Sequence, residues 1–125
     1  MSTAEVANLT ITDIAHRLLD LCKTGQYEQA QEELYSEDAV CIEPLNSRMQ
    51  SVKGLEEIKK KGRDFQGMVE EIHNSTVTGP VVVGNHFAIG FMLDLTLKGV
   101  GRQRMEELAV YEVKDGKVVK EQFFF

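Results

Sequence analysis

The residues of this sequence best suited to chemistry are a few acidic side chains set among apolar neighbours. Glu43 lies between Ile42 and Pro44, at the end of a short apolar run. A carboxylate that its neighbours shield from water suits general base work near neutral pH. The alternative is an ordinary polar residue that faces solvent at the end of a strand. We therefore predict Glu43 as the catalytic base of an acid–base site, with the solvated strand end as the competing interpretation.

Two further acids, Glu107 and Glu121, lie in strand-like runs that flank the Asp-Gly pair at 115–116, which is a strong hairpin signal. A two-residue loop would place these acids on opposite faces. A three-residue loop at 114–116 would place them on one face, because opposed residues point the same way. The alternative for each acid is an exposed charge at a strand edge or at the rim of a dimer. The face predicted for the three-residue loop carries Glu107, Ala109, Tyr111, Val119, Glu121 and Phe123.

One histidine is a further candidate. His73 lies between Ile72 and Asn74 in a strand-like run, and beside a glutamate it could act as an acid or base, or donate a hydrogen bond to a ligand carbonyl. A purely structural histidine is the alternative. The three histidines of the sequence lack H-x-H or H-E-x-x-H spacing, so no metal site is predicted. The sequence also has no G-x-S-x-G, P-loop or G-x-G-x-x-G motif, and we predict no cofactor.

Charge and composition limit the partners that we expect. The chain has 125 residues and a net charge of −6, so it is predicted to bind neither nucleic acid nor anionic membranes, which require a concentrated basic surface. The basic cluster at 59–63 follows acids at helical spacing, as in Glu57 and Lys61, which predicts a solvated helix face. No apolar run is long enough to span a membrane, and the N-terminus has no signal-peptide pattern. We therefore expect a cytoplasmic protein.

Periodicity places the candidate residues on an α+β frame. Apolar residues at helical spacing predict helices in the first half of the chain, and period-two runs predict strands in the second. Thr10 with Asp13 resembles a capping box, and Gly25 suits a helix end. The predicted helices span 11–24, 27 to about 36, where a polar turn at 36–38 ends the second helix, and 55–67. The predicted strands span 39–43, 70–78, 80–97 with a further turn or bulge at 84–85, 102–114 and 117–125. This order predicts one domain over 1–125, with three N-terminal helices and a mostly antiparallel sheet.

The run 87–97 alternates large apolar residues with smaller or polar ones, as a strand between two different environments would. The residues predicted to face the core are Phe87, Ile89, Phe91, Leu93 and Leu95. The residues predicted to face the other side are His86, Ala88, Gly90, Met92 and Asp94. Asp94 is predicted to pair across a dimer interface, with a role as a second acid as the alternative. Cys22 and Cys41 lie in apolar sequence and are predicted to be small core residues.

The order of these features resembles the nuclear transport factor 2-like superfamily, which includes ketosteroid isomerases and SnoaL-like polyketide cyclases. The resemblance covers nearly the whole chain. The residues that carry it are a first helix ending in Gly25, Ser-Glu-Asp-Ala-Val-Cys-Ile-Glu-Pro at 36–44, Gly-Leu-Glu-Glu-Ile at 54–58 and Asp-Gly-Lys-Val-Val at 115–119. The resemblance implies a cystatin-like cone, in which a strongly curved sheet wraps around the helices. It also implies a pocket between the first helix and the concave sheet face, and a homodimer through the convex face.

Roles for single residues also follow from the resemblance. In ketosteroid isomerases an aspartate base works opposite an oxyanion hole made by a tyrosine and a protonated aspartate. The base position falls on Glu43, the tyrosine on Leu18 and the second aspartate on or beside Ala109, so both oxyanion donors are missing. His73 is implied to face the pocket. The residues expected to contact a ligand are Leu18, Glu107, Ala109, Tyr111, Glu121, Phe123 and Phe125.

Two functions are open at this point. The first is a pocket that binds a small apolar molecule and performs cofactor-free acid–base chemistry, such as isomerisation, cyclisation or dehydration, with Glu43 as base and His73 or Tyr111 as donor. The second is a non-catalytic ligand-binding or protein-interaction module that keeps the cone without the chemistry. The missing oxyanion donors favour the second function, and the apolar surroundings of Glu43 favour the first.

Overall fold

Residues 9–125 are described by the computed structural model, in which the first helix, α2 (Ile11–Lys23), begins at a capping box. The backbone N–H of Asp13 donates to Thr10 Oγ1 at 3.1 Å, and the Thr10 N–H donates to Asp13 Oδ2 at 3.2 Å. These two bonds satisfy N–H groups that a helix start would otherwise leave without partners. The predicted helix is therefore confirmed. Its buried face consists of Ile14, Ala15, Leu18, Leu19, Leu21 and Cys22.

The second helix, α3 (Tyr27–Leu34), passes directly into strand β1 (Tyr35–Ile42), so the turn predicted near 36–38 is wrong. β1 pairs with the last strand of the chain, and the pairing register shifts between Tyr35 and Val40. A bulge of this kind leaves extra residues outside the ladder, where polar side chains can face solvent. The polar stretch at 36–38 is therefore the bulged part of a strand, although its composition is typical of a turn.

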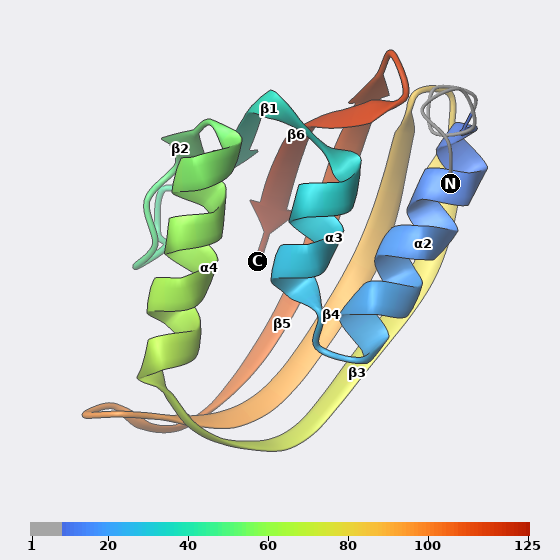
Figure 1. The fold of residues 1–125 in the computed structure, drawn as a ribbon. Coiled ribbons are helices and arrows are strands. Elements are labelled where there is room, and N and C mark those ends of the chain that lie inside the picture. Colours follow the sequence, from blue (N-terminus) through green and yellow to red (C-terminus); the bar gives the residue numbers. More distant parts are fainter. Residues whose placement is uncertain (1–8) are drawn as a thin grey trace.

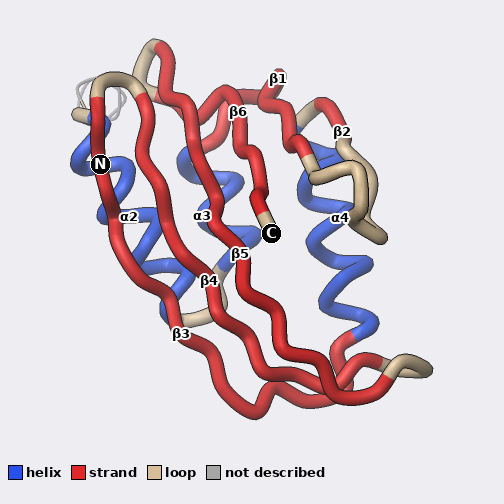
Figure 2. Tube along the Cα trace, turned by 180° about the vertical axis from the view of Figure 1, so that it is seen from behind, coloured by secondary structure: helices blue, strands red, loops and turns tan. Residues whose placement is uncertain are grey.

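The remaining elements complete one sheet with helices on one side. They are β2 (Val52–Lys53), α4 (Leu55–Met68), β3 (Val69–Val83), β4 (His86–Leu97), β5 (Gly101–Lys114) and β6 (Lys117–Phe124). The strand order is β2-β1-β6-β5-β4-β3, and the β1–β6 pair is parallel while the others are antiparallel. Figures 1 and 2 show the sheet bending around the helices, which all lie on its concave side. The predicted α+β cone is confirmed.

Strand β3 continues through the Gly79-Pro80 pair, where the sequence predicts a break. The register with β4 shifts between Thr78 and Val81, so a bulge absorbs the two residues that cannot follow a regular ladder. The chain reverses at 84–85, where a turn or bulge was predicted, and the φ of +60° at Gly84 is a backbone conformation that glycine adopts readily. Gly-Pro therefore bends this strand but does not end it.

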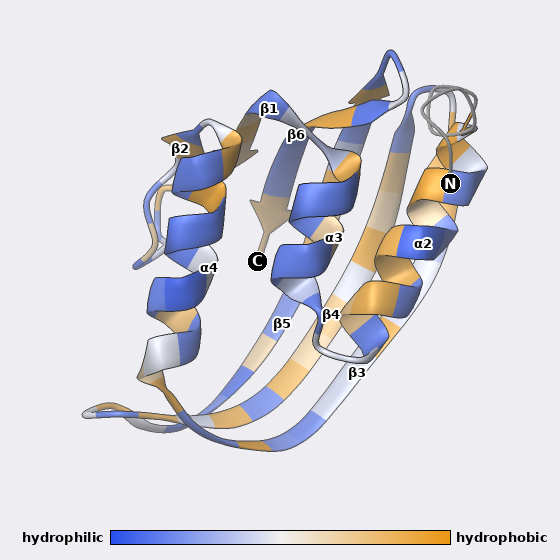
Figure 3. Cartoon of the chain, in the orientation of Figure 1, coloured by the Kyte–Doolittle hydropathy of each residue, from blue (hydrophilic) through white to orange (hydrophobic). Residues whose placement is uncertain are grey.

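Strand β4 has the two faces that its alternation predicts, and Figure 3 shows the stripes of hydropathy along it. Of the predicted core residues, Phe87, Ile89, Phe91 and Leu95 are buried, and Leu93 is half-buried. On the opposite face Asp94 accepts two hydrogen bonds from the Arg102 guanidinium, at 2.9 and 2.8 Å. The partner of Asp94 in the described structure therefore belongs to the same chain.

The closing hairpin has a two-residue turn. Lys114 pairs with Lys117, and the residues between them, Asp115 and Gly116, have φ values of +52° and +74°. Positive φ at both central positions is the type I′ turn that Asp-Gly favours. The two-residue loop is therefore the correct alternative for the turn itself.

A bulge just after this turn changes which side chains share a face. Val113 pairs with Val118, but the next pair is Glu112 with Lys120, so Val119 is skipped. Tyr111 consequently lies opposite Glu121. The two-residue turn would by itself have turned Glu121 to the outer face, and the extra residue returns it to the inner face. The side chains that share the inner face are therefore those predicted for the three-residue loop, except that Val118 is buried in place of Val119. The bulge, and not a three-residue loop, produces this arrangement.

A helix can cross a membrane only if it is long and apolar enough. Among residues 9–125, no helix is both long and apolar enough to cross a bilayer.

Candidate functional site

A cavity of about 480 Å³ lies between the helices and the concave face of the sheet. The helices α2, α3 and α4 and the strands β1, β3, β4, β5 and β6 contribute to its wall. Its aromatic residues are Tyr27, Tyr35, Phe65, Phe91, Tyr111 and Phe123. The exposed residues Gln66 and Ile72 also line it, so the cavity reaches the protein surface. Its size and mainly apolar wall suit a small organic molecule.

Polar groups gather in two places on this wall. We call Glu43, Lys61 and Glu107 the outer cluster, because these residues are only partly buried. We call Tyr35, Tyr111 and Glu121 the inner cluster, because all three are buried.

The outer cluster is built around an ion pair. Lys61 Nζ lies 2.8 Å from Glu43 Oε1, and the two side chains are 13% and 8% exposed. Burial lowers the pKa of Lys61, but the hydrogen bond to Glu43 and the nearby Cys41 outweigh this effect and raise it. Ser47 Oγ adds a weaker hydrogen bond of 3.4 Å to the other Glu43 oxygen. The alternative in which Glu43 faces water is therefore wrong, and its role as a base stays a prediction.

The position of Lys61 corrects the interpretation of the basic cluster. It does not lie on a solvated helix face; it turns into the cavity, where its Nζ is also 3.2 Å from Cys41 Sγ and 6.0 Å from the centre of the Phe123 ring. The sequence does contain a signal for this. Lys61 follows Ile58 by three positions and precedes Phe65 by four, and residues at this spacing share one helix face. The many charged residues at 59–63 obscure the apolar stripe to which Lys61 belongs.

Glu107 completes the outer cluster from strand β5. Burial, followed by the negative charge of Glu43, raises its pKa from 4.5 to about 7, although the Lys61 ammonium opposes the rise. A carboxyl group with this pKa is present in both protonation states near neutral pH. Glu107 can therefore both accept and release a proton inside the cavity.

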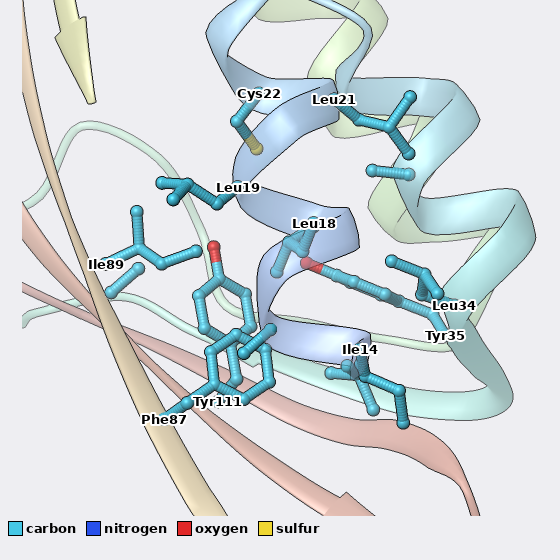
Figure 4. Packing of buried hydrophobic residues seen from close by; sticks show 14 of the residues in the cluster. Ile14, Leu18, Leu19, Leu21, Cys22, Leu34, Tyr35, Phe87, Ile89 and Tyr111 are labelled. Carbon is cyan, nitrogen blue, oxygen red and sulfur yellow. The ribbon is translucent and has the colours of Figure 1, made fainter. Parts of the chain in front are cut away.

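The inner cluster is held by a hydrogen bond between elements that are far apart in sequence. The Tyr35 hydroxyl donates to Glu121 Oε2, and both residues are buried. The rings of Tyr35 and Tyr111 meet edge to face at 6.5 Å, and Tyr111 stacks on Phe87 at 4.8 Å. Figure 4 shows the Tyr35 hydroxyl beside Leu18 and the Tyr111 ring next to Phe87. Sequence reasoning missed Tyr35, because it placed this residue at a helix end.

Burial dominates the electrostatics of the inner cluster. It raises the pKa of Glu121, while the hydrogen bond from Tyr35, the Cys41 thiol and the charge of Lys61 oppose the rise. It also raises the pKa of Tyr35 and of Tyr111, and Glu121 in its ionised form adds to both shifts. Uncharged forms are therefore favoured at all three positions.

The structure brings most of the predicted site residues together. Those that line the cavity are Leu18, Glu43, Glu107, Tyr111, Glu121 and Phe123. Ala109 is fully buried in the core, and Phe125 is 51% exposed, so neither belongs to the cavity wall. The structure does not place these two residues on the cavity wall, and their contact with a ligand stays a prediction. Phe125 follows the last paired residue of β6, so no ladder holds its side chain inward.

His73 also lies outside the cavity, so its predicted position is wrong. Its Nε2 is 2.7 Å from Thr96 Oγ1 on the outer face of the sheet. Ile72, its neighbour in β3, lines the cavity instead. The register with β4 shifts between Ile72 and Asn74, so regular alternation is interrupted at His73, and its contact with Thr96 shows that it points outward. His73 cannot reach a ligand in the cavity from this position.

The acidic and thiol side chains of the described residues can be compared with the ligand sets of metal ions. Within residues 9–125, no three His, Cys, Asp or Glu side chains are grouped as the ligands of a metal ion would be. The outer carboxylate Glu43 already contacts the Lys61 ammonium. The arrangement is suited to hydrogen bonding and proton transfer with a bound molecule.

A model of the SnoaL-like domain matches residues 9–125 of this sequence. The chain belongs to the SnoaL-like family. A search of curated proteins found no significant match to this SnoaL-like chain. Among solved structures, a proposed SnoaL-like polyketide cyclase from Mesorhizobium loti is 34% identical and superposes with a TM-score of 0.87, over 94% of this chain and 100% of that one.

Two more distant structures show the same fold. A protein of unknown function with a cystatin-like fold, from Xanthomonas campestris, is 18% identical with a TM-score of 0.77, over 93% of this chain and 90% of that one. A protein with a ketosteroid isomerase-like fold, from Catenulispora acidiphila, was solved with trimethylamine; it is 18% identical with a TM-score of 0.71, over 93% and 87% of the two chains. These two structures share the fold of this SnoaL-like chain at low sequence identity. The chemistry of this chain is therefore inferred from its own cavity.

Proposed function

We propose that the cavity binds a small, mainly apolar carbonyl compound, and that Glu107 moves a proton at the carbon next to the carbonyl without a cofactor. The observation that carries this proposal is a carboxyl group with a pKa of about 7 on the wall of an otherwise apolar cavity. An acid–base group is most effective when its pKa lies near the working pH. The reaction class is isomerisation, cyclisation or dehydration. The description of the Mesorhizobium loti relative as a polyketide cyclase is consistent with it.

In this mechanism the Glu107 carboxylate accepts a proton from the carbon, and the electron pair moves onto the carbonyl oxygen. Protonated Glu107 then returns the proton at another atom of the same molecule, so no net charge is gained or lost. The ion pair of Lys61 with Glu43 affects the Glu107 pKa in two opposite ways, because the ammonium lowers it and the Glu43 carboxylate raises it. Glu43 is the second candidate base, but its carboxylate is already engaged by the Lys61 ammonium at 2.8 Å.

Deuterium uptake from heavy water at the carbon next to the carbonyl tests this proposal. A panel of cyclic ketones and enones is incubated with the wild type, and exchange is followed by NMR. Glu107→Gln should lower the exchange rate about a hundredfold or more. The control is Glu106→Gln, because Glu106 is 63% exposed in its pair with Arg104 and should leave the rate unchanged. Equal rates for wild type and Glu107→Gln would contradict the role of Glu107, and a loss confined to Glu43→Gln would assign the base to Glu43.

A second function is binding without turnover. It is favoured by the apolar residues at two positions where the resemblance implied oxyanion donors, since Leu18 lines the cavity and Ala109 is buried. In that case members of the panel raise the melting temperature of the protein, because they bind only the native state, and none of them exchanges deuterium faster than in buffer.

We also propose that the chain forms a homodimer through the outer face of the sheet. Apolar residues exposed there alternate with inward-facing neighbours, and they are Val81, Met92, Leu108 and Phe124. Exposed apolar residues that gather on one face favour a partner surface. Light scattering after size exclusion should give a dimer for the wild type and a monomer for Leu108→Glu; a monomeric wild type would contradict the proposal. The cytoplasmic location expected from the sequence stays a prediction.

A further inference from the structure

The inner cluster holds a buried acid that the proposed proton transfer by Glu107 does not use. Glu121 is 5% exposed, lines the cavity and accepts the Tyr35 hydroxyl at Oε2. Burial raises the pKa of Glu121, whereas the Tyr35 hydroxyl and the Cys41 thiol lower it, because both favour the ionised form. The donors around this group therefore suit a carboxylate, although burial favours the uncharged acid.

The charges on the cavity wall leave Glu121 without a cationic partner. Lys61 is the one cation among the cavity-lining residues of the described chain. Its ammonium lies 2.8 Å from Glu43 Oε1, and it acts on Glu121 only through its charge at longer range. Together with Glu107, the wall carries three carboxyl groups and one ammonium. A charge that a ligand brings into this cavity is therefore favoured if it is positive and disfavoured if it is negative.

Lys61 shows how the wall of this cavity can hold an ammonium group. Besides its contact with Glu43, its Nζ lies 6.0 Å from the centre of the Phe123 ring. A carboxylate attracts an ammonium through its charge, and an aromatic ring attracts it through its quadrupole. The inner cluster offers the same two kinds of group, since the rings of Tyr35 and Tyr111 line the cavity beside Glu121. A second ammonium can be held there on the same principle.

From this arrangement we infer that the inner cluster binds the protonated amine of a ligand, with Glu121 as its anionic partner and the Tyr35 hydroxyl holding the carboxylate in place. The substrate class of the cavity is then an amino carbonyl compound with an apolar body. This inference rests on the proposed function, because it assigns a second group of the ligand on which Glu107 acts. It also excludes carboxylic acids as substrates, because their charge has the wrong sign for this wall.

The distance between the two clusters determines how far apart the two groups of the ligand lie. Glu121 pairs with Tyr111, and Glu107 lies four residues before Tyr111 on β5. Four residues of strand span roughly 13 Å. The amine and the carbon that Glu107 deprotonates therefore lie towards opposite ends of the ligand, with several carbon atoms between them. A cavity of about 480 Å³ has room for a molecule of this length.

Several titratable groups around Glu121 also act on a bound ammonium. The groups that face Glu121 are Cys22 on α2, Tyr35 and Cys41 on β1, Glu43 just after β1, Lys61 on α4, and Glu107 and Tyr111 on β5. Burial raises the pKa of both thiols and of both hydroxyls, so these four groups stay uncharged near neutral pH. The Lys61 ammonium repels a second cation, but Glu43 compensates its charge. The carboxyl groups therefore decide which charge the cavity prefers.

Binding should depend on pH because Glu121 has to lose its proton. A protonated amine displaces this proton to the solvent, whereas an uncharged amine takes the proton up directly, and both routes end in the same ion pair. As long as Glu121 is protonated in the free protein, the affinity for the protonated amine should rise about tenfold per pH unit, since one proton is released for each amine bound.

The first test compares cyclohexylamine, cyclohexanol and cyclohexanecarboxylate, which share a ring and differ in charge. Isothermal titration calorimetry at pH 7.5 should give the amine an affinity about tenfold or more above that of the alcohol, and no binding of the carboxylate. Glu121→Gln keeps the shape of the side chain and removes its charge, so the preference for the amine should be lost. The control is Glu112→Gln, because Glu112 neighbours Tyr111 in β5 but lies outside this cavity, and it should keep the preference.

Two outcomes of this test would overturn the inference. One is an equal affinity of the wild type for the amine and the alcohol. The other is a preference that survives Glu121→Gln and disappears in Glu107→Gln, because the ammonium would then lie at the outer cluster.

The second test uses only the wild type, so it does not depend on the folding of a variant. The carboxyl carbon of Glu121 is assigned by carbon-13 NMR through its bonds to the backbone. At pH 7, saturating cyclohexylamine should move this signal from the position of a neutral acid towards that of a carboxylate, and cyclohexanol should leave it unchanged. Calorimetry in two buffers of different ionisation enthalpy should show about one proton released per amine bound. A Glu121 signal that does not move at saturation would overturn the inference.

The outcomes also separate this inference from the proposed function, because these probes carry no ketone or aldehyde group. If cyclic ketones exchange deuterium but the wild type does not prefer the amine, only this inference falls. If cyclohexylamine binds at Glu121 but no ketone or amino ketone exchanges deuterium, the proposed function fails and the inner cluster remains an amine-binding site.

Discussion

The outer and inner clusters hold carboxyl groups in one cavity under opposite conditions. Glu43 contacts the Lys61 ammonium at 2.8 Å, whereas buried Glu121 contacts the Tyr35 hydroxyl. An ammonium compensates a negative charge, but a hydroxyl supplies only a dipole. The two buried carboxyl groups therefore differ in the kind of partner they have, which is an ammonium in the outer cluster and a hydroxyl in the inner one. The type of acid is the same in both clusters, so the difference comes from the elements that meet there.

Glu107 lies between these two conditions. Its pKa of about 7 reflects burial and two neighbouring acids, moderated by one lysine. It has neither a direct cationic partner, as Glu43 has, nor the full burial of Glu121. This intermediate environment makes it the group in the cavity best placed to exchange protons near neutral pH.

The largest expected effect comes from removing the cation of the outer cluster. Lys61→Met leaves Glu43 mostly buried without its partner, which should lower the free energy of unfolding by about 2–4 kcal/mol at neutral pH. Urea unfolding measures the loss. The control Lys60→Met changes the exposed neighbouring residue and should cost little. Adding Glu43→Gln to Lys61→Met should recover part of the stability; no recovery would show that packing, not charge, sets the loss.

A smaller effect is expected from Glu107, because its substitution should change the pH dependence of stability, whereas substitution of its exposed neighbour Glu106 should not. The folded-state pKa of about 7 lies above the ordinary value of 4.5, so the folded protein binds more protons than the unfolded chain between these values. Stability should therefore fall as the pH rises from 4.5 through 7, and the full loss is present above 7. With solvent screening, Glu107→Gln should relieve about 1–2 kcal/mol at pH 8. Glu106→Gln is the control, and a relief that does not depend on pH would contradict the shift.

Within the inner cluster, Tyr35→Phe tests whether Glu121 is neutral. Loss of the hydroxyl that donates to Glu121 should cost about 1–2 kcal/mol in unfolding free energy. Because this bond favours the ionised form of Glu121, the variant should hold the neutral form more firmly. The cost should thus be the same at pH 6 and pH 8. A cost that grows with pH would show that Glu121 ionises in this range and would remove the contrast between the clusters.

The smallest effect is expected where the clusters meet. Cys41 is buried, and its Sγ lies 3.2 Å from Lys61 Nζ. Cys41→Ala should cost about 1 kcal/mol through lost packing and leave the pH dependence due to Glu107 unchanged. Carbon-13 titration of Glu107 in this variant measures the latter. A displaced Glu107 titration would mean that the thiol couples the two clusters.

Much of the frame could be predicted because its signals are local. The capping box of Thr10 and Asp13 determines where α2 begins, and the alternation along β4 determines which side chains face the core. Leu18 and Phe123 could be placed in the cavity on the same basis, with the resemblance supplying the concave face. These inferences require only the spacing of residues within one element.

Other parts of the site depend on features that spacing within one element does not contain. Skipping Val119 reverses the faces of β6, and a single extra residue of this kind changes nothing in the composition of the run. His73 is a second case, since the resemblance placed it in the cavity, whereas it lies at a register shift between β3 and β4 and contacts Thr96 on the outer face.

The sequence by itself determined an α+β cone with acids and aromatic residues facing a pocket. Only the tertiary structure decided which partner each acid has. Lys61 meets Glu43 across 18 residues of sequence, and Tyr35 meets Glu121 across 86. Periodicity shows which face a side chain takes, but a protonation state depends on charges and dipoles a few ångströms away. Those neighbours come from other elements, so the chemistry of this cavity is determined when the helices close over the sheet.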